Sequence, residues 1–432
     1  MLQDDVNSQP VLKGPEVSRQ LFGGVLDFDA AGHYPGLELL NLIFCCDSEL
    51  ILPSGEEVKV TRRSHDLARR LVWDPNFEAD KRRHSVLLDD ENAESTLREL
   101  FRCLQLEIPS GTKEPTWTRA HFFPYTSSLI HWDSRERGNK ISLERLYLRG
   151  GGSLAFKILR FDPDEDRLTR IRIGLENLYT ATEDSPLDVL ASFVNLQSYS
   201  DANATVDEIE KSSSVVETPF FDTYRNGVQA LLEQEHATSV SKVRSLMGWT
   251  SIWLVLMQNR QVQDKLGKST PIIICDCGAD NPQLKKASQR CLQDAMNDII
   301  TAVKSIEPNL PNAQQNKIKS FFWATAAANG FLNAWKGRKH FTLSIDALEV
   351  IVLATVPTGT QMPFERFVQQ ILYERLGIAI GRGAAEDSGL IQSIDASIFE
   401  ENEAQLAIQM VASGLVTQYS DATRMVSPKP TS

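Results

Sequence analysis

Cysteine is scarce in this chain of 432 residues, and its few cysteines do not form a metal-binding pattern. They stand at positions 45, 46, 103, 275, 277 and 291, with no Cys-x-x-Cys motif among them. Six cysteines in a chain of this length exclude a disulfide scaffold, and the missing motif argues against a zinc ribbon or finger. We therefore expect reduced thiols, a cytoplasmic location and no bound metal.

A long hydrophobic run is also missing. The longest strongly apolar stretch lies within residues 247–257, well short of the ~20 residues that a membrane-spanning helix requires. The chain opens with Met-Leu-Gln-Asp-Asp, without the basic start and apolar segment of a secretory signal. These absences predict that no membrane is a partner and that residues 247–257 belong to a buried helix.

Positive charge is in deficit, because 45 lysines and arginines face 57 acidic residues and the net charge is −12. This balance excludes a protein whose whole surface coats nucleic acid or anionic lipid. Hydrophobic residues make up 42% of the chain and charged residues 24%, which is ordinary for a globular protein. At about 100–200 residues per domain, the length predicts about three domains.

A polar segment separates the predicted domains. Residues 198–215 are small and polar, and they cannot bury enough surface to offset the entropy of ordering them. Residues 1–197 are predicted to form a mixed α/β domain with hairpins, residues 216–339 a mainly helical domain, and residues 340–432 a winged-helix-like module. The predicted fold class is thus mixed α+β and rich in helix.

The N-terminal domain is predicted to contain one early helix and two hairpins. Gly36–Cys46 spaces its apolar residues as a helix does. Residues 49–60 flank a Pro-Ser-Gly turn, which is typical of a hairpin. Residues 153–161 and 167–173 alternate in polarity around a turn that begins at Asp162, and they predict the clearest hairpin of the chain.

The middle domain is predicted to be a series of helices. They cover residues 220–234, 239–265, 282–306 and 314–334. A short apolar run over 271–275 precedes the third of them, which predicts a strand–helix unit.

The last domain is predicted to be three helices followed by a hairpin. The helices cover 344–355, a segment beginning at Pro363, and 402–413, and the hairpin covers 415–426. Helices that end in a compact hairpin resemble a winged helix.

Winged helices that bind DNA present lysine and arginine on the recognition helix. The corresponding segment here, residues 401–410, has neither, and the hairpin offers only Arg424. Because carboxylates cannot replace the counterions of DNA, we expect this acidic module to bind protein rather than duplex DNA.

Two glycine-containing segments fail as nucleotide loops. Gly267-Lys268-Ser269 ends like a phosphate loop, but Val262 stands where that motif needs glycine, and a helix precedes it. Gly377, Gly381 and Gly383 lack the third glycine of a dinucleotide fingerprint. No cofactor is predicted.

A polar cluster follows the strand predicted over 271–275. It comprises Cys275, Asp276, Cys277 and Asp280, at a strand end where functional residues gather in α/β sheets. The thiols have no basic neighbour that would make them reactive. One interpretation is therefore packing and helix capping by the two acids, and the other is a metal or catalytic site. The seven histidines, at 33, 65, 84, 121, 131, 236 and 340, form no recognisable motif and are expected to be structural.

A nuclease-like constellation lies on the first predicted hairpin. Asp47 precedes Glu57-Val58-Lys59, as in PD-(D/E)xK nucleases, whose carboxylates hold Mg²⁺ while the lysine orients water. Asp47, Glu57 and Lys59 are the candidate catalytic residues of this hypothesis. The alternative interpretation is the solvated face of a hairpin.

A basic island stands against the acidic average of the chain. Its candidate nucleic-acid-binding residues are Arg62, Arg63, Arg69, Arg70, Arg82 and Arg83. Aromatic and basic residues also mix over 119–132, which suits single-stranded nucleic acid as well as ordinary protein interfaces.

The mixed front, helical middle and acidic winged-helix end resemble accessory subunits of multi-protein prokaryotic DNA-processing or phage-defence systems. This resemblance is architectural and implies a non-enzymatic scaffold or adaptor subunit. The alternatives are a nucleic-acid-binding component that uses the Arg62–Arg83 island and a metal-dependent nuclease. A steep dependence of DNA affinity on salt would favour the island over the scaffold.

The nuclease hypothesis predicts that the purified chain cuts DNA when Mg²⁺ is present. Glu57→Ala should abolish this cleavage, because it removes a metal-binding carboxylate. A gel-based cleavage assay with and without chelator measures the effect. Equal cleavage by the variant would contradict the assignment.

Overall fold

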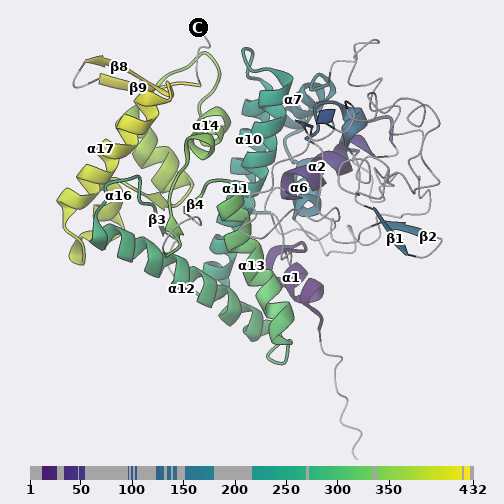
Figure 1. The fold of residues 1–432 in the computed structure, drawn as a ribbon, viewed down its shortest axis with the longest axis horizontal. Coiled ribbons are helices and arrows are strands. Elements are labelled where there is room, and N and C mark those ends of the chain that lie inside the picture. The colour runs from purple at the N-terminus through teal and green to yellow at the C-terminus, as the bar shows by residue number, and fades with distance from the viewer. Residues whose placement is uncertain are drawn as a thin grey trace, which may run out of the picture.

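The structure of this protein is a computed structural model, which describes several parts of the chain. They are residues 12–26, 34–46, 48–53, 96, 99–100, 103–104, 123–130, 134–137, 140–143, 151–179, 217–268, 272–333, 338–420 and 423–428. The predicted linker over 198–215 lies outside them. The described fold is rich in helix with a few small sheets, as the sequence predicts (Figure 1).

Helix α11 (Ser239–Lys265) runs through the centre of the molecule (Figure 1). Its side chains are buried on every side from Trp249 to Asn259. A helix that is apolar all round must be covered by other elements. Four helices do so: α2 (Tyr34–Phe44), α10 (Pro219–Leu232), α13 (Asn312–Ala328) and α14 (Ile345–Thr355).

The contact between α10 and α11 is close and carries its own hydrogen bonds. The indole nitrogens of Trp249 and Trp253 donate to the carbonyl oxygens of Tyr224 and Phe220, each at 3.1 Å. A side chain at Gly227 would overlap the indole of Trp249. The two buried indoles are therefore satisfied, and glycine is required where the helices cross.

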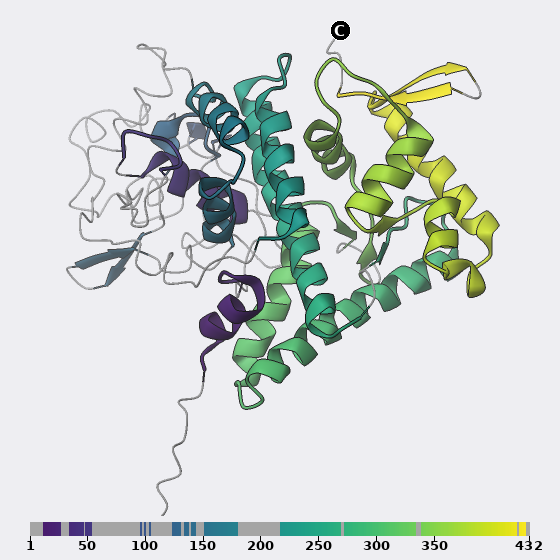
Figure 2. The same cartoon turned by 180° about the vertical axis from the view of Figure 1, so that it is seen from behind.

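The N-terminal region packs against one side of this centre (Figure 2). Its helices are α1 (Gly14–Phe22), α2, α6 (Gly152–Arg160) and α7 (Glu165–Glu176), with a short 3-10 turn η3 (Ser127–Leu129) and a hairpin of β1 (Ser134–Arg137) and β2 (Lys140–Leu143). The helix predicted over Gly36–Cys46 is confirmed as α2, which begins two residues earlier.

The hairpin predicted over 153–161 and 167–173 is wrong, because both segments are helices, α6 and α7. Nearly every residue of α6 is buried. The alternation of polar and apolar residues in this segment therefore does not distinguish a buried face from an exposed face, as it would in a strand. The Asp162–Asp164 turn caps a helix instead of closing a hairpin: the Asp164 carboxylate accepts from the Arg167 N–H at 3.0 Å.

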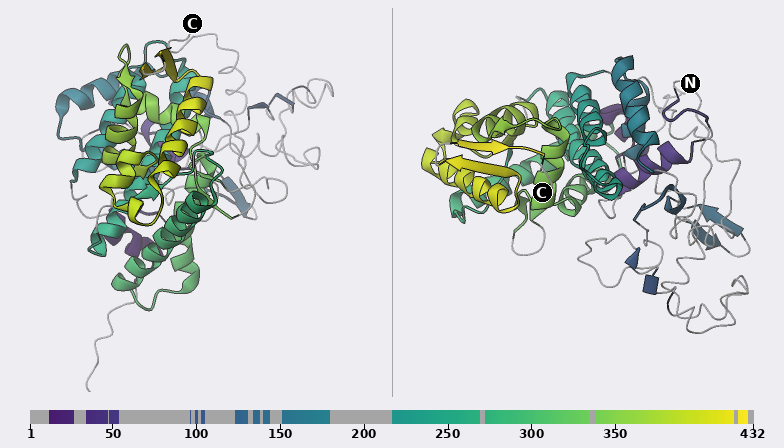
Figure 3. Two further views of the ribbon diagram at one scale, coloured as in Figure 1. Left: turned by 90° about the vertical axis from the view of Figure 1, so that its left-hand side faces the viewer. Right: turned by 90° about the horizontal axis from the view of Figure 1, so that it is seen from above.

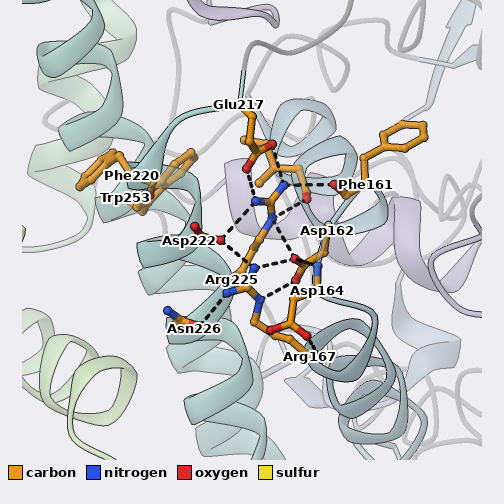
Figure 4. A network of polar contacts seen from close by, with 11 residues as sticks. Phe161, Asp162, Asp164, Arg167, Glu217, Phe220, Asp222, Arg225, Asn226 and Trp253 are labelled. Atoms are coloured by element: carbon orange, nitrogen blue, oxygen red, sulfur yellow. Dashed lines mark hydrogen bonds and ion pairs between the residues drawn. The ribbon is translucent and has the colours of Figure 1, made fainter.

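A buried ionic network joins this turn to α10 (Figure 4). The Arg167 guanidinium donates to both oxygens of Asp162 and also to Asp222, the last at 2.7 Å. Arg225, which is 1% exposed, donates to the Ile158 carbonyl at 3.0 Å and pairs with Glu217. The network links the N-terminal region to α10 through two buried arginines, the buried Asp162 carboxylate and the half-exposed carboxylates of Asp222 and Glu217.

The predicted strand–helix unit is confirmed as β3 (Ile273–Ile274) and α12 (Pro282–Ile306). Strand β3 pairs in parallel with β7 (Ile378–Ala379) and so joins the middle of the chain to its last part. The helix predicted over 314–334 ends at Ala328, because Gly330 has φ +68° and the chain then enters β4 (Leu332–Asn333). Strand β4 pairs with β5 (His340–Phe341).

The C-terminal region contains the predicted helices and hairpin. Its elements are α14, β6 (Met362–Pro363), α15 (Phe364–Arg366), the π-helix η5 (Phe367–Arg375), α16 (Arg382–Asp387), the 3-10 turn η6 (Leu390–Gln392), α17 (Ala396–Ala412), β8 (Val416–Ser420) and β9 (Thr423–Val426). The strands form an antiparallel sheet in the order β6-β9-β8. Helix α17 begins six residues before the predicted start at Asn402, because Asp395 caps it by accepting from the Ser397 N–H.

One hydrophobic cluster runs from Val17 to Val426 and includes side chains from each predicted domain. A second cluster, with Ile274, Leu284 and Phe399, joins β3 and α12 to α17. No helix in the described parts of the chain is both long and apolar enough to cross a membrane.

The buried network predicts that Asp162→Ala lowers the stability of the fold. The substitution removes the buried carboxylate that Arg167 and Arg225 share and leaves them with the half-exposed Asp222 and Glu217, so it should lower the free energy of unfolding by about 3 kcal/mol. Glu386→Ala, which breaks the exposed pair with Arg382, should leave stability nearly unchanged. Urea unfolding of both variants measures the difference, and equal stabilities would refute the role of the network.

Candidate functional site

Two sets of residues singled out by the sequence lie outside the described parts of the chain. They are the nuclease candidates Asp47, Glu57 and Lys59 and the basic candidates Arg62, Arg63, Arg69, Arg70, Arg82 and Arg83. The nuclease and the nucleic-acid hypotheses therefore stay predictions.

The end of β3 places Asp276 in the lining of a cleft. The Asp276 N–H donates to the Phe341 carbonyl of β5 at 3.0 Å, and the next N–H, of Cys277, donates to the Asn402 side chain of α17 at 2.7 Å. Asn402 also donates to the Cys275 and Ile380 carbonyls, at 2.9 and 3.1 Å. One buried amide thus fixes α17 to the ends of both parallel strands.

A buried carboxylate–imidazole pair forms the base of this cleft. The Nε2 of His340 lies 3.5 Å from Oδ2 of Asp276, and its Nδ1 lies 3.1 Å from the Arg338 carbonyl. Both ring nitrogens face acceptors, and only the imidazolium can donate to both. The pair raises the pKa of His340, chiefly through Asp276. Burial opposes ionisation of Asp276, but the hydrogen bonds from His340 and the Gly278 N–H lower its pKa.

The strand-end cleft has a volume of about 370 Å³. Its lining residues are Asp276, Gly278, Lys285, Gln289, Asn333, Arg338, His340 and Thr342. The lining side chains are thus almost all polar, and they come from the end of β3, from α12 and from the β4–β5 pair and its neighbouring residues. Such a cleft can hold a small polar molecule, but its imidazole is already committed to Asp276.

The other members of the strand-end cluster do not join the cleft. Cys275 and Cys277 are buried, and burial raises the pKa of each thiol, so both stay protonated at neutral pH and are poor nucleophiles. Asp280 is exposed and pairs with Lys285. The proposed capping by an acid is wrong, since the Asn281 side chain caps α12 by accepting from the Gln283 N–H at 2.9 Å.

The described residues contain no group of three or more His, Cys, Asp or Glu that could hold a metal ion. In the rejected phosphate loop, Lys268 pairs with Asp298 of α12. Gly381 precedes the first residue of α16 and lies beside the Glu403 carboxylate, which would repel a phosphate.

A second candidate surface is the outer stripe of α17, at the edge of the molecule away from the N-terminal helices (Figure 3). Its exposed members recur every three or four residues: Ser397, Glu400, Glu401, Ala404, Ile408 and Val411. Ile408 is 59% exposed and Val411 37%, whereas Phe399 and Leu406 on the opposite face are buried. The stripe is acidic in its first half and apolar in its second.

Sequence reasoning found Asp276 but missed its partner. His340 lies 64 positions later on another strand, and no spacing rule relates the two. The signal for the outer stripe was present, because the apolar residues of α17 are too numerous for one buried face. Comparison of the chain with protein-family models, curated proteins and solved structures finds no match.

The Asp276–His340 pair predicts a pH-dependent stability. The pKa of His340 is raised above its ordinary 6.5, so its contribution is complete below pH 6.5 and is lost as pH rises through the raised pKa. The pKa of Asp276 is lowered from 3.8, so its contribution is lost only as pH falls through that lower value. The pair therefore stabilises the fold most between these limits.

His340→Gln should remove about 1 kcal/mol of stability at pH 6 and less at pH 9. Thermal unfolding at both pH values measures the effect, with His236→Gln as the control because His236 is exposed. A loss that is the same at both pH values would show that the imidazolium does not contribute.

Proposed function

We propose that this chain is a non-enzymatic adaptor that binds a basic protein partner through the outer stripe of α17. One observation carries the proposal: residues 383–423 contain no lysine or arginine. Over the same residues there are seven acids, Glu386, Asp387, Asp395, Glu400, Glu401, Glu403 and Asp421. A partner with positive charge is attracted to this region, and like-charged partners are repelled.

The stripe supplies apolar contact as well as charge. Glu401 suits lysine or arginine of the partner, whereas Glu400 already pairs with Arg382 at 2.6 Å. Ala404, Ile408 and Val411 suit apolar side chains one to three turns further along. An exposed apolar row beside a charged one is typical of a protein interface. The occupant that fits is therefore an amphipathic segment with basic and apolar residues.

The arrangement of the C-terminal elements supports a winged-helix-like module. Three helical segments, α14, the α15–η5 segment and α17, precede or flank the antiparallel sheet β6-β9-β8. In DNA-binding relatives of this architecture, the helix before the hairpin carries the basic residues. Here that helix is α17, whose carboxylates oppose phosphate, so the module suits protein binding better than duplex DNA.

We further place this adaptor in a larger assembly of the kind that processes or restricts DNA in prokaryotes. The architectural resemblance supports this setting. The chemistry of the strand-end cleft agrees with a non-enzymatic role, because its imidazole is ion-paired and its neighbouring thiols are protonated.

The test compares two exposed isoleucines, Ile408 on α17 and Ile173 on α7. Ile408→Lys places a cation in the stripe and should abolish partner binding, since it repels a basic surface and removes apolar contact. Ile173→Lys, on α7, makes the same change at a residue that is 51% exposed and should leave binding intact. Tagged full-length chains are recovered from the host after cross-linking through a photo-reactive residue at position 404.

Support requires that the cross-linked partner segment carries lysine or arginine beside apolar residues, and that the cross-link weakens as salt rises. A partner retained by Ile408→Lys would overturn the proposal. Recovery of nucleic acid in place of protein, with a steep dependence of affinity on salt, would favour the basic island instead.

A further inference from the structure

The strand-end cleft is built from two elements that a buried hydroxyl holds together. The Ser288 hydroxyl of α12 donates to the Phe341 carbonyl at 3.3 Å and accepts from the Phe341 N–H at 2.8 Å. The Phe341 side chain is buried in the core, so the side chains of His340 and Thr342 lie on the opposite face of the strand, where they line the cleft. Helix α12 and strand β5 thus form a fixed frame, as in a preformed ligand site.

Helical spacing and strand pairing bring further polar side chains to the same cleft. Lys285 and Gln289 stand at positions i and i+4 of α12 and therefore share one face of the helix. Asn333 of β4 is paired with His340 in the register of the sheet, so these two side chains are neighbours on one face. The lining groups therefore surround the cleft from α12, β4 and β5.

Positive charge exceeds negative charge among the described residues that line the cleft. Lys285 and Arg338 are cationic, and the Asp276 carboxylate is balanced by His340, whose Nε2 lies 3.5 Å from its Oδ2. The other carboxylate oxygen, Oδ1, accepts from the Gly278 N–H at 3.0 Å. In a chain with a net charge of −12, two cations in one cleft favour an anionic ligand.

Both cations can still bind a ligand. Lys285 pairs with Asp280, but the Asp280 side chain is 92% exposed and does not line the cleft, so this pair contributes little. An ammonium group has three N–H donors, and the charge of Lys285 acts on the base of the cleft, because it lowers the pKa values of both Asp276 and His340. Arg338 is exposed, and a guanidinium presents a planar fork of N–H donors to an anion.

The arrangement of the lining groups restricts the class of anion. Gln289, Asn333 and Thr342 are neutral residues that can donate hydrogen bonds from different sides of the cleft. The acceptor directions of a carboxylate lie near one plane, whereas the terminal oxygens of a phosphate point in tetrahedral directions. The volume of about 370 Å³ is near the lower end of the roughly 300–1,000 Å³ usual for small-molecule sites. These features favour a small phosphate monoester over a dicarboxylate or a nucleotide.

We propose that the strand-end cleft binds a small phosphorylated metabolite, with its phosphate between Lys285 and Arg338. The site does not depend on the proposed adaptor function, because the outer stripe of α17 contributes no residue to the lining of the cleft. The ligand is bound and not transformed, since His340 stays paired with Asp276.

The test is calorimetric titration of the full chain with glycerol phosphate, with glycerol and succinate as comparison ligands. We expect glycerol phosphate to bind at least about tenfold more tightly than either. Lys285→Gln and Arg338→Gln should each weaken its binding about tenfold, the effect of one lost charged hydrogen bond. Lys286→Gln and Arg290→Gln are the matched controls, because they remove the same charge from exposed positions of α12 outside the cleft, and they should leave binding within about twofold.

An NMR titration of the histidine rings gives a second readout in the wild-type chain. A bound dianion stabilises the His340 imidazolium beside it, so glycerol phosphate should raise the pKa of His340 further. The charged groups Asp276 and Lys285 act on this ring with and without ligand. His236 is exposed and lies outside the cleft, so its pKa should not change.

Three outcomes would overturn the proposal. They are no binding of glycerol phosphate, tighter binding of succinate, and equal weakening by Lys285→Gln and Lys286→Gln, which would show unspecific attraction to α12. Titration with the tripeptide Ala-phosphoserine-Ala distinguishes a free metabolite from a phosphorylated protein. Tighter binding of the tripeptide than of glycerol phosphate would contradict the assignment to a metabolite.

Discussion

The burial of α11 on all sides is the constraint on which the rest of this structure depends. A helix with two tryptophans and a continuous apolar middle must be covered by other elements, and α2, α10, α13 and α14 do so. Each covering helix then presents its outer side to a further element. The N-terminal region attaches through the Arg167–Asp162–Arg225 network, and the C-terminal region attaches through the β3–β7 pair.

The β3–β7 pair also decides where the functional surfaces lie. Asn402 ties the inner face of α17 to both strand ends, and the helix must therefore turn its outer stripe to solvent. The same strand ends hold Asp276 against His340 on one side of α12, while a cavity of about 500 Å³ opens on the other. The exposed stripe of α17 and two cavities thus share one small structural unit.

The spacing of apolar residues predicted the long helices well. It failed for segments whose residues are buried on all sides. Helices α10, α11 and α12 carry caps, breakers and helical spacing that can be read locally. The segments that became α6 and α7 were predicted as strands, because residues buried on all sides give no period. Asp276 was singled out by its place after a strand, whereas Asn281 was overlooked as the cap of α12.

By itself, the sequence determined the charge distribution, the absence of a basic residue over 383–423, and the apolar content of α11. These are properties of composition and short-range order, and they do not change on folding. Only the tertiary structure decided that Asp276 meets His340 and that Ile408 faces solvent. Contacts between distant segments depend on which helices pack together, and no local pattern encodes that choice.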